Sequence, residues 1–224
     1  ISGGASSTMA GWTAVGRFES DTDQESVGLL DIRNGTLTCN GPGGAIFAAE
    51  EGIGVINVHP AGNLVAEKSL RLGGGIADTK PGTGTVNLLG GTITVNNIDQ
   101  TNNAFADGTL NLDGGTIVAR LTTTTFLEGL DRAYVRSGGV TFDSNGNDIT
   151  IAQPLLEPTG DGIATIPILN SGSGYTGAPL LLIEGGDGTR ATASVILDGS
   201  GFVDAIEITN PGTDYTVAPT VTVL

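Results

Sequence analysis

Two stretches of the sequence decide the fold: Val86-Asn-Leu-Leu-Gly-Gly-Thr-Ile-Thr-Val95 and Leu110-Asn-Leu-Asp-Gly-Gly-Thr-Ile-Val-Ala119. The second repeats the apolar and polar pattern of the first 24 residues later. A third Gly-Gly pair follows after the same interval at Gly138-Gly139, and looser copies come earlier, at 30–38 and 56–65. Self-similarity at a fixed period is the sequence sign of a repeat architecture.

A period of about 24 residues fits one coil of a parallel β-solenoid, or β-helix, built from two or three short strands and tight turns. Within each copy, alternation of period two sends Leu112 and Ile117 to one face and the Thr and Asn residues to the other. The alternative is an antiparallel sandwich, which normally spaces its strands by about 8–12 residues. We therefore predict an all-β chain with a parallel β-solenoid over residues 1–158.

A second repeat of a different kind follows the solenoid. The sequence Ile166-Pro-Ile-Leu-Asn-Ser-Gly-Ser-Gly-Tyr-Thr-Gly-Ala-Pro179 returns 40 residues later as Ile206-Glu-Ile-Thr-Asn-Pro-Gly-Thr-Asp-Tyr-Thr-Val-Ala-Pro219. The stretch 153–162 is rich in Pro and Gly and predicts a boundary between the two repeat types. Residues 159–224 are thus predicted to form a small β-rich module of two related units of about 40 residues. The second unit stops early, which indicates a truncated array.

These motifs carry a resemblance to known families. Gly28-Leu-Leu-Asp-Ile-Arg-Asn-Gly-Thr-Leu37 and the segment 135–154 resemble the autotransporter-associated β-strand repeats of very large bacterial surface proteins. The motif Gly172-Ser-Gly-Tyr-Thr-Gly-Ala-Pro179 is similar to repeats of phage tail proteins and bacterial extracellular proteins. The resemblance implies a parallel β-helix that is displayed outside a bacterial cell, at its surface.

The amino-acid composition and net charge argue against two classes of binding partner, nucleic acids and anionic membranes. The 224 residues include 37 Gly, 24 Asp and Glu, and only nine Lys and Arg, for a net charge of −15. Nine scattered cations cannot neutralise a nucleic-acid backbone or an anionic membrane, so neither is expected as a partner. No apolar run approaches the roughly 18 residues of a membrane span. The single cysteine, Cys39, excludes an intrachain disulfide and is expected to be buried.

Two acidic segments are candidate calcium sites, and we expect no other cofactor. The loop Asp143-Ser-Asn-Gly-Asn-Asp148 gathers the oxygen-bearing side chains of Asp143, Asn145, Asn147 and Asp148. The segment Glu19-Ser-Asp-Thr-Asp-Gln-Glu25 places four carboxylates at every second position. Neither segment has a full ligand set, and the alternative is a solvated acidic loop with an Asx turn.

Aromatic and basic residues give further candidates. Tyr175 and Tyr215 hold equivalent positions in the two 40-residue units, where they either stack on a glycan or fill a corner with the hydroxyl bonded to backbone. Trp12 is expected to cap the first coil. The only histidine, His59, is predicted to lie exposed in a turn, and the segment 127–133 to form a short helical turn.

The pattern indicates a mechanical role rather than catalysis. We expect a segment of a surface stalk, fibre or self-assembling filament, whose partners are copies of itself, head-to-tail or lateral. One alternative is a glycan-binding adhesin or tail-like module. Another is a polysaccharide lyase or hydrolase, for which Asp78 and Lys80 share a loop while Asp99, Asp107 and Asp113 are dispersed.

Overall fold

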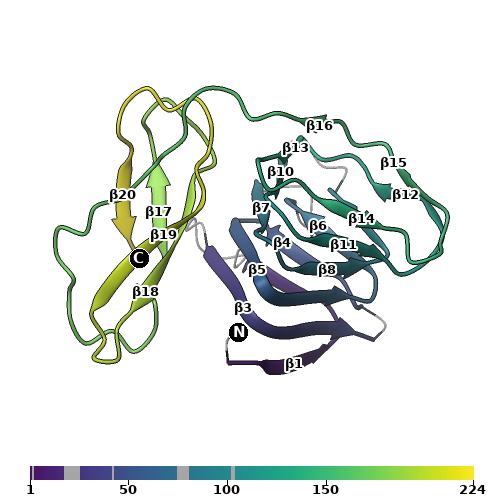
Figure 1. Cartoon of the computed structure of the whole chain (residues 1–224), viewed down its shortest axis with the longest axis horizontal. Helices are drawn as coiled ribbons and strands as arrows, with labels where there is room; N and C mark the ends of the chain where they lie inside the picture. The colour runs from purple at the N-terminus through teal and green to yellow at the C-terminus, as the bar shows by residue number, and fades with distance from the viewer. Residues whose placement is uncertain (2, 18–25, 42, 75–80, 102–103) are drawn as a thin grey trace. The chain divides into compact units, whose positions relative to one another are not determined.

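The computed structural model describes all residues except 2, 18–25, 42, 75–80 and 102–103. Its described residues form β-strands and no helix. They divide into two compact units, Ile1–Glu157 and Pro158–Leu224 (Figure 1). None of the described residues belongs to a helix with the length and apolar character needed to cross a lipid bilayer.

The first unit is a parallel β-solenoid with three faces, and each coil after the first contributes one strand or half-strand to each face. The first face contains the first halves of β3 (Val27–Asn40) and β5 (Ile53–Ala66), then β7 (Gly82–Leu88), β10 (Ala106–Leu112), β13 (Arg132–Val135) and β16 (Leu155–Leu156). The second face contains β1 (Ala5–Ala10), the second halves of β3 and β5, β8 (Thr92–Val95), β11 (Thr116–Ala119) and β14 (Thr141–Asp143). The third face contains β2 (Thr13–Arg17), β4 (Ile46–Glu50), β6 (Ser69–Leu72), β9 (Asn97–Asp99), β12 (Thr123–Leu127) and β15 (Ile149–Ile151).

The register between coils confirms the predicted repeat. Ile93 in β8 pairs directly with Ile117 in β11, 24 positions later, and the ladder is parallel. Other coils are longer: Ile98 pairs with Leu127 at an interval of 29 positions. Turns of different length absorb these differences, while the strands remain in register. Every ladder within the solenoid is parallel, so the antiparallel sandwich is wrong for this unit.

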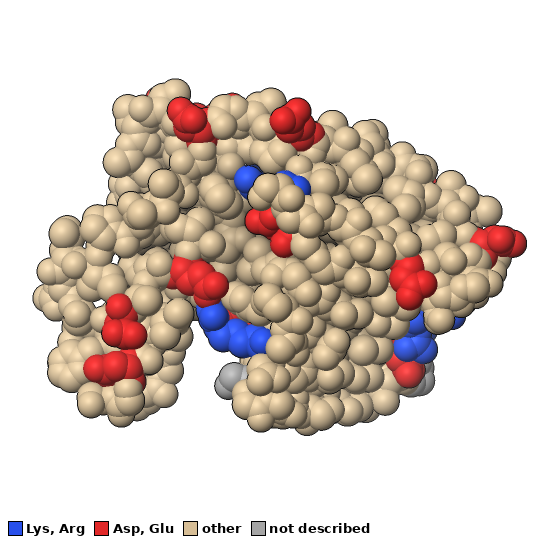
Figure 2. Space-filling model, in the orientation of Figure 1, with Lys and Arg blue, Asp and Glu red and all other residues tan. Residues whose placement is uncertain are grey.

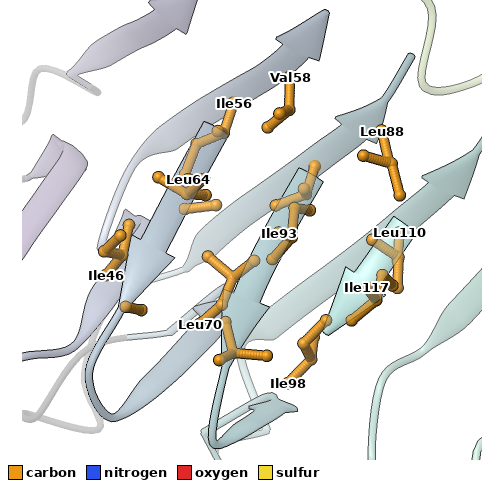
Figure 3. Close-up of a cluster of buried hydrophobic side chains, with 14 of the residues drawn as sticks. Ile46, Ile56, Val58, Leu64, Leu70, Leu88, Ile93, Ile98, Leu110 and Ile117 are labelled. Atoms are coloured by element: carbon orange, nitrogen blue, oxygen red, sulfur yellow. The ribbon is translucent and has the colours of Figure 1, made fainter. Parts of the chain in front are cut away.

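The core consists of apolar side chains stacked in rows, one residue from each coil (Figure 3). One row runs through Ile56, Val86 and Leu110, which pair in sequence across the first face and are fully buried. Equivalent rows line the other two faces, and Cys39 is buried as predicted. Burying each such aliphatic side chain contributes about 1.5–3 kcal/mol, so the stack of coils is the main source of stability.

A row of glycines sets how closely the first and third faces approach. Gly28, Gly54, Gly84 and Gly108 pair with one another across the first face. A Cβ atom at Gly84 would overlap the carbonyl oxygen of Ala48 in β4. None of the four has a left-handed φ, so glycine is needed here for close approach rather than for a turn.

The second unit contains two small antiparallel sheets. Strand β17 (Leu181–Glu184) pairs with β20 (Thr220–Val223), and β18 (Thr192–Leu197) forms a hairpin with β19 (Val203–Asn210). Leu182 lies opposite Thr222, its equivalent in the second copy of the repeat. The two copies of this strand therefore pair about a local twofold axis, which is how the 40-residue duplication builds a sheet.

The predicted helical turn at 127–133 is wrong. Leu127 ends β12, and β13 begins at Arg132 after an irregular connection in which Gly129 has a left-handed φ. Leu130 within that connection is buried. Its backbone N–H donates to the Gln153 side chain (2.8 Å), whose amide donates in turn to the Leu130 carbonyl (3.1 Å). This side chain satisfies the backbone groups that a helical turn would otherwise satisfy.

Candidate functional site

A cluster of charged and polar side chains on the first face surrounds Asp31. His59 Nε2 lies 2.8 Å from Asp31 Oδ1, and Arg33 Nε lies 2.6 Å from Oδ2. The Asn57 amide also donates to Oδ1 (3.2 Å). Burial by itself raises the pKa of Asp31, but the hydrogen bond and charge of His59, the charge of Arg33 and the Asn57 amide outweigh it, so that the pKa lies below its ordinary value.

The prediction that His59 lies exposed in a turn is wrong. The residue is in β5, and only 6% of its surface is exposed. The following Pro60 led us to expect a turn, whereas β5 continues through it to the second face. His59 and Asp31 come from neighbouring coils, so their contact joins β5 to β3.

The cluster continues into a row of buried asparagines. Asn57, Asn87 and Asn111 pair in register across three coils and are at most 1% exposed. The Asn87 amide donates to Asn57 Oδ1 (2.7 Å), and the Asn111 amide donates to Asn87 Oδ1 (2.9 Å). Each amide thus donates to the side-chain oxygen one coil before it, and the row fixes the register between coils. At the end of the row, Asn111 Oδ1 is buried and accepts no hydrogen bond from the described residues.

Sequence reasoning placed these asparagines on the face opposite the core but did not identify the row. The signal is the pattern Gly-x-apolar-Asp/Asn-apolar, which occurs at 28–32, 54–58, 84–88 and 108–112. Aligning these four segments places Asp31 and the three asparagines in one column. Their common role is to hold coils together, and the chemistry of the row is hydrogen bonding along the solenoid.

Charged residues on the solenoid surface also pair between coils. Arg71 in β6 contacts Asp99 in β9 (3.1 Å), and Arg132 in β13 contacts Asp107 in β10 (2.8 Å). Figure 2 shows acidic and basic side chains as small separate groups on the visible face. Ion pairs this exposed contribute little each, up to about 1 kcal/mol.

The described carboxylates that were candidates for a lyase or hydrolase site make contacts between coils. Asp99 and Asp107 belong to the two ion pairs above, and Asp113 Oδ1 accepts from the Gly138 N–H (2.8 Å). Burial raises the pKa of Asp99, although Arg71 and Asn97 oppose the shift. Asp78 and Lys80 lie outside the described residues. The structure therefore separates these carboxylates into contacts that each bridge neighbouring coils.

The predicted calcium loop is a compact turn after β14. The Asn145 N–H donates to Asp143 Oδ1 (2.8 Å), which is the Asx turn that we considered as the alternative. The Asn147 amide donates to the Ser144 carbonyl (3.0 Å), and the Asp148 N–H donates to Thr122 Oγ1 (3.2 Å). Among the described residues, no three His, Cys, Asp or Glu side chains form a group suited to a metal ion. Calcium at Asp143, Asn145, Asn147 and Asp148 stays a prediction, and the segment 19–25 lies outside the described residues.

The two equivalent tyrosines pack on glycines of their own turns. The Tyr175 ring lies over Gly172, and the Tyr215 ring lies over Gly212. The Ala191 N–H donates to the Tyr215 hydroxyl (3.3 Å), which is a corner contact to backbone. Both side chains are partly exposed, and glycan contact at these tyrosines stays a prediction.

The first coil presents unpaired strand edges. Within the described residues, β1 pairs only with β3, and β2 pairs only with β4. Met9 in β1 lies in register with the buried Cys39, yet 42% of its surface is exposed. Trp12 is equally exposed and packs edge-on against Phe47, with the Arg17 guanidinium 4.9 Å from its ring. Among the described residues, no further coil covers the apolar rows of the core at this end.

Comparisons with known proteins add no relative: no protein family matches the chain, and neither a curated protein nor a solved structure resembles it significantly.

Proposed function

We propose that this protein is a structural segment of a bacterial surface stalk or fibre, in which copies of the chain associate end to end through their solenoids. The observation that carries the proposal is the open edge of the first coil. In the part of the chain that the structure describes, each of its strands has a partner on one side alone, and its inward side chains, such as Met9, continue the rows of the core. Such an edge is a template for pairing with another chain.

The last coil offers the complementary surface. Strands β14 and β15 end their ladders, each with one partner among the described residues. Since β1 and β14 belong to the same face, and β2 and β15 to another, the last coil of one copy matches the first coil of the next. Stacking between copies would then repeat the pairing that already joins coils within the chain. The net charge of −15 keeps the sides of such a column soluble.

The test measures self-association of the purified full chain by sedimentation velocity over a wide range of concentration, with negative-stain microscopy of the same samples. We expect linear assemblies that lengthen with concentration. In the Met9→Lys variant the added ammonium lies on the inward side of the edge, where another coil would bury it, and assembly should be lost.

Thr8→Lys is the matched control, because Thr8 is the exposed neighbour of Met9 and alternation directs its side chain to the opposite side of β1. It adds the same charge and should leave assembly unchanged. Circular dichroism melts establish that both variants are folded. A wild-type chain that stays monomeric throughout, or equal loss of assembly in both variants, would overturn the proposal.

A further inference from the structure

One copy of the module repeat lacks the strand partner that the other copy has. Segment 163–170 is equivalent to β19, with Ile166, Ile168 and Asn170 in the places of Ile206, Ile208 and Asn210. Strand β19 pairs along its length with β18, whereas segment 163–170 forms no strand. Apart from the Ile163 N–H, which donates to the Pro211 carbonyl (2.8 Å), the backbone of 163–169 makes no hydrogen bond within the described residues.

The sequence explains why this partner is missing. The hairpin partner β18 covers residues 192–197, and the positions 40 residues earlier are 152–157. Those positions contain β16 (Leu155–Leu156), which pairs with β13 as the last strand of the first face of the solenoid. The residues that would form the first module hairpin are therefore used by the solenoid.

An apolar cavity lies beside the unpaired segment, entirely within the second unit. Its volume is about 380 Å³, and its lining includes Ile166, Leu169, Leu181, Val195 and Val221. Leu169 is 93% exposed and Ile168 is 37% exposed. In the complete copy, by contrast, Ala193 and Val195 of β18 are buried at 6% and 7% exposure. An exposed apolar segment next to an apolar cavity is typical of a binding surface.

We propose that segment 163–170 accepts an extended β-strand from another polypeptide. This strand would resemble β18 in its side chains and would pair with the segment as β18 pairs with β19. The other copy of the repeat shows this occupant: an uncharged strand whose apolar side chains alternate, as Ala193, Val195 and Leu197 do. Main-chain hydrogen bonds would provide affinity, and alternate side chains entering the cavity would provide specificity. The inference concerns the second unit and does not depend on end-to-end assembly of the solenoid.

Pro167 restricts this pairing to one edge of the segment. It has no backbone N–H, and it takes the place of Glu207, which lies opposite Ser194 in the complete hairpin. In an antiparallel pair every second residue directs its N–H away from the partner, so a proline at such a position leaves one edge able to pair. The other edge cannot form a regular ladder, which limits the segment to a single partner strand.

The test uses a fluorescent synthetic peptide with the sequence of residues 190–199, Arg-Ala-Thr-Ala-Ser-Val-Ile-Leu-Asp-Gly, titrated with the full chain and followed by anisotropy. We expect saturable binding with one peptide per chain. Leu169→Arg should raise the dissociation constant at least about tenfold. Val217→Arg is the matched control, because Val217 is 60% exposed in the same unit and does not line the cavity. This control should bind as the wild type does.

Peptides that carry one N-methyl group separate strand pairing from simple apolar contact. Methylation at Ser194 and at Val195 blocks N–H groups on opposite edges of the strand, so only one of the two should abolish binding. Absence of peptide binding, equal affinity for Leu169→Arg and wild type, or equal affinity of both methylated peptides would overturn the inference. Binding of a small apolar dye without the peptide, or dimerisation through the segment in place of peptide binding, would also overturn it.

Discussion

At the scale of single residues, Asp31 joins two kinds of interaction. Its carboxylate receives the Asn57 amide at the end of the buried asparagine row, and it also contacts His59 and Arg33. Because the pKa of Asp31 lies below its ordinary value, the folded protein favours the carboxylate more than the unfolded chain does. Asp31 therefore stabilises the fold above the ordinary carboxyl pKa, and this stabilisation is lost as pH falls through the lowered folded-state value.

We predict that Asp31→Asn lowers the free energy of unfolding at pH 7 by about 1–2 kcal/mol, since an amide keeps the shape but loses the charge that holds Arg33 and His59. The variant should also lose less stability than the wild type when the pH falls from about 5 to about 2. Urea unfolding followed by circular dichroism at several pH values measures both effects.

Asp204→Asn serves as the control, because Asp204 is exposed on β19 in the second unit and the substitution removes the same charge. It should leave the solenoid's unfolding free energy unchanged at pH 7. Should Asp31→Asn and wild type lose stability in parallel on acidification, the assignment of the lowered pKa to Asp31 is wrong.

At the scale of the strand, the glycine row determines whether neighbouring faces can close around the core. Gly84→Ala should lower the free energy of unfolding by about 1–3 kcal/mol, because the new Cβ meets the Ala48 carbonyl, and backbone cannot move aside as a side chain can. Chemical denaturation of the full chain gives this difference directly.

Gly177→Ala is the matched substitution at an unconstrained site. An added Cβ at Gly177 meets no atom within 4 Å, and its φ is outside the left-handed region. Its unfolding free energy should equal or slightly exceed that of the wild type. Equal stability of Gly84→Ala and Gly177→Ala would mean that the close approach of the two faces does not depend on this row.

Strands were predictable from the sequence where a repeat keeps its length. Segments 86–95 and 110–119 share one interval, so alternation and the Gly-Gly pairs together predict stacked coils. The asparagine row was not predicted because the intervals between its members differ: 30 positions separate Asn57 from Asn87, and 24 separate Asn87 from Asn111. Segment 163–170 has the sequence of a strand, but a strand also needs a partner, and sequence similarity does not show that its partner is used elsewhere.

At the scale of the whole molecule, repulsion between carboxylates opposes the contacts that join coils. The chain has 24 Asp and Glu against nine Lys and Arg. Several arginines already pair with carboxylates between coils, among them Arg17 with Glu50 and Arg120 with Glu67. The excess negative charge therefore has no basic counterpart, and compaction brings these like charges together.

Salt should accordingly stabilise this protein. Raising sodium chloride from about 0.01 M to 0.15 M shortens the Debye length from about 30 Å to about 8 Å and screens the long-range repulsion more than the short ion pairs. We expect Tm at pH 7 to rise by roughly 2–4 °C, the change that about 1 kcal/mol produces in a chain of this size. Differential scanning calorimetry of the full chain measures it.

The isoelectric point provides the control, because the repulsion vanishes there while general effects of salt on the surface remain. Near pH 4.1, where the net charge is close to zero, the same addition of salt should leave Tm unchanged or lower it. A fall in Tm with salt at pH 7 would mean that the ion pairs between coils, rather than the repulsion of the excess carboxylates, dominate the electrostatic free energy of the fold. The acidic surface would then be arranged to hold the coils together, and its charge would contribute to the stability of the solenoid.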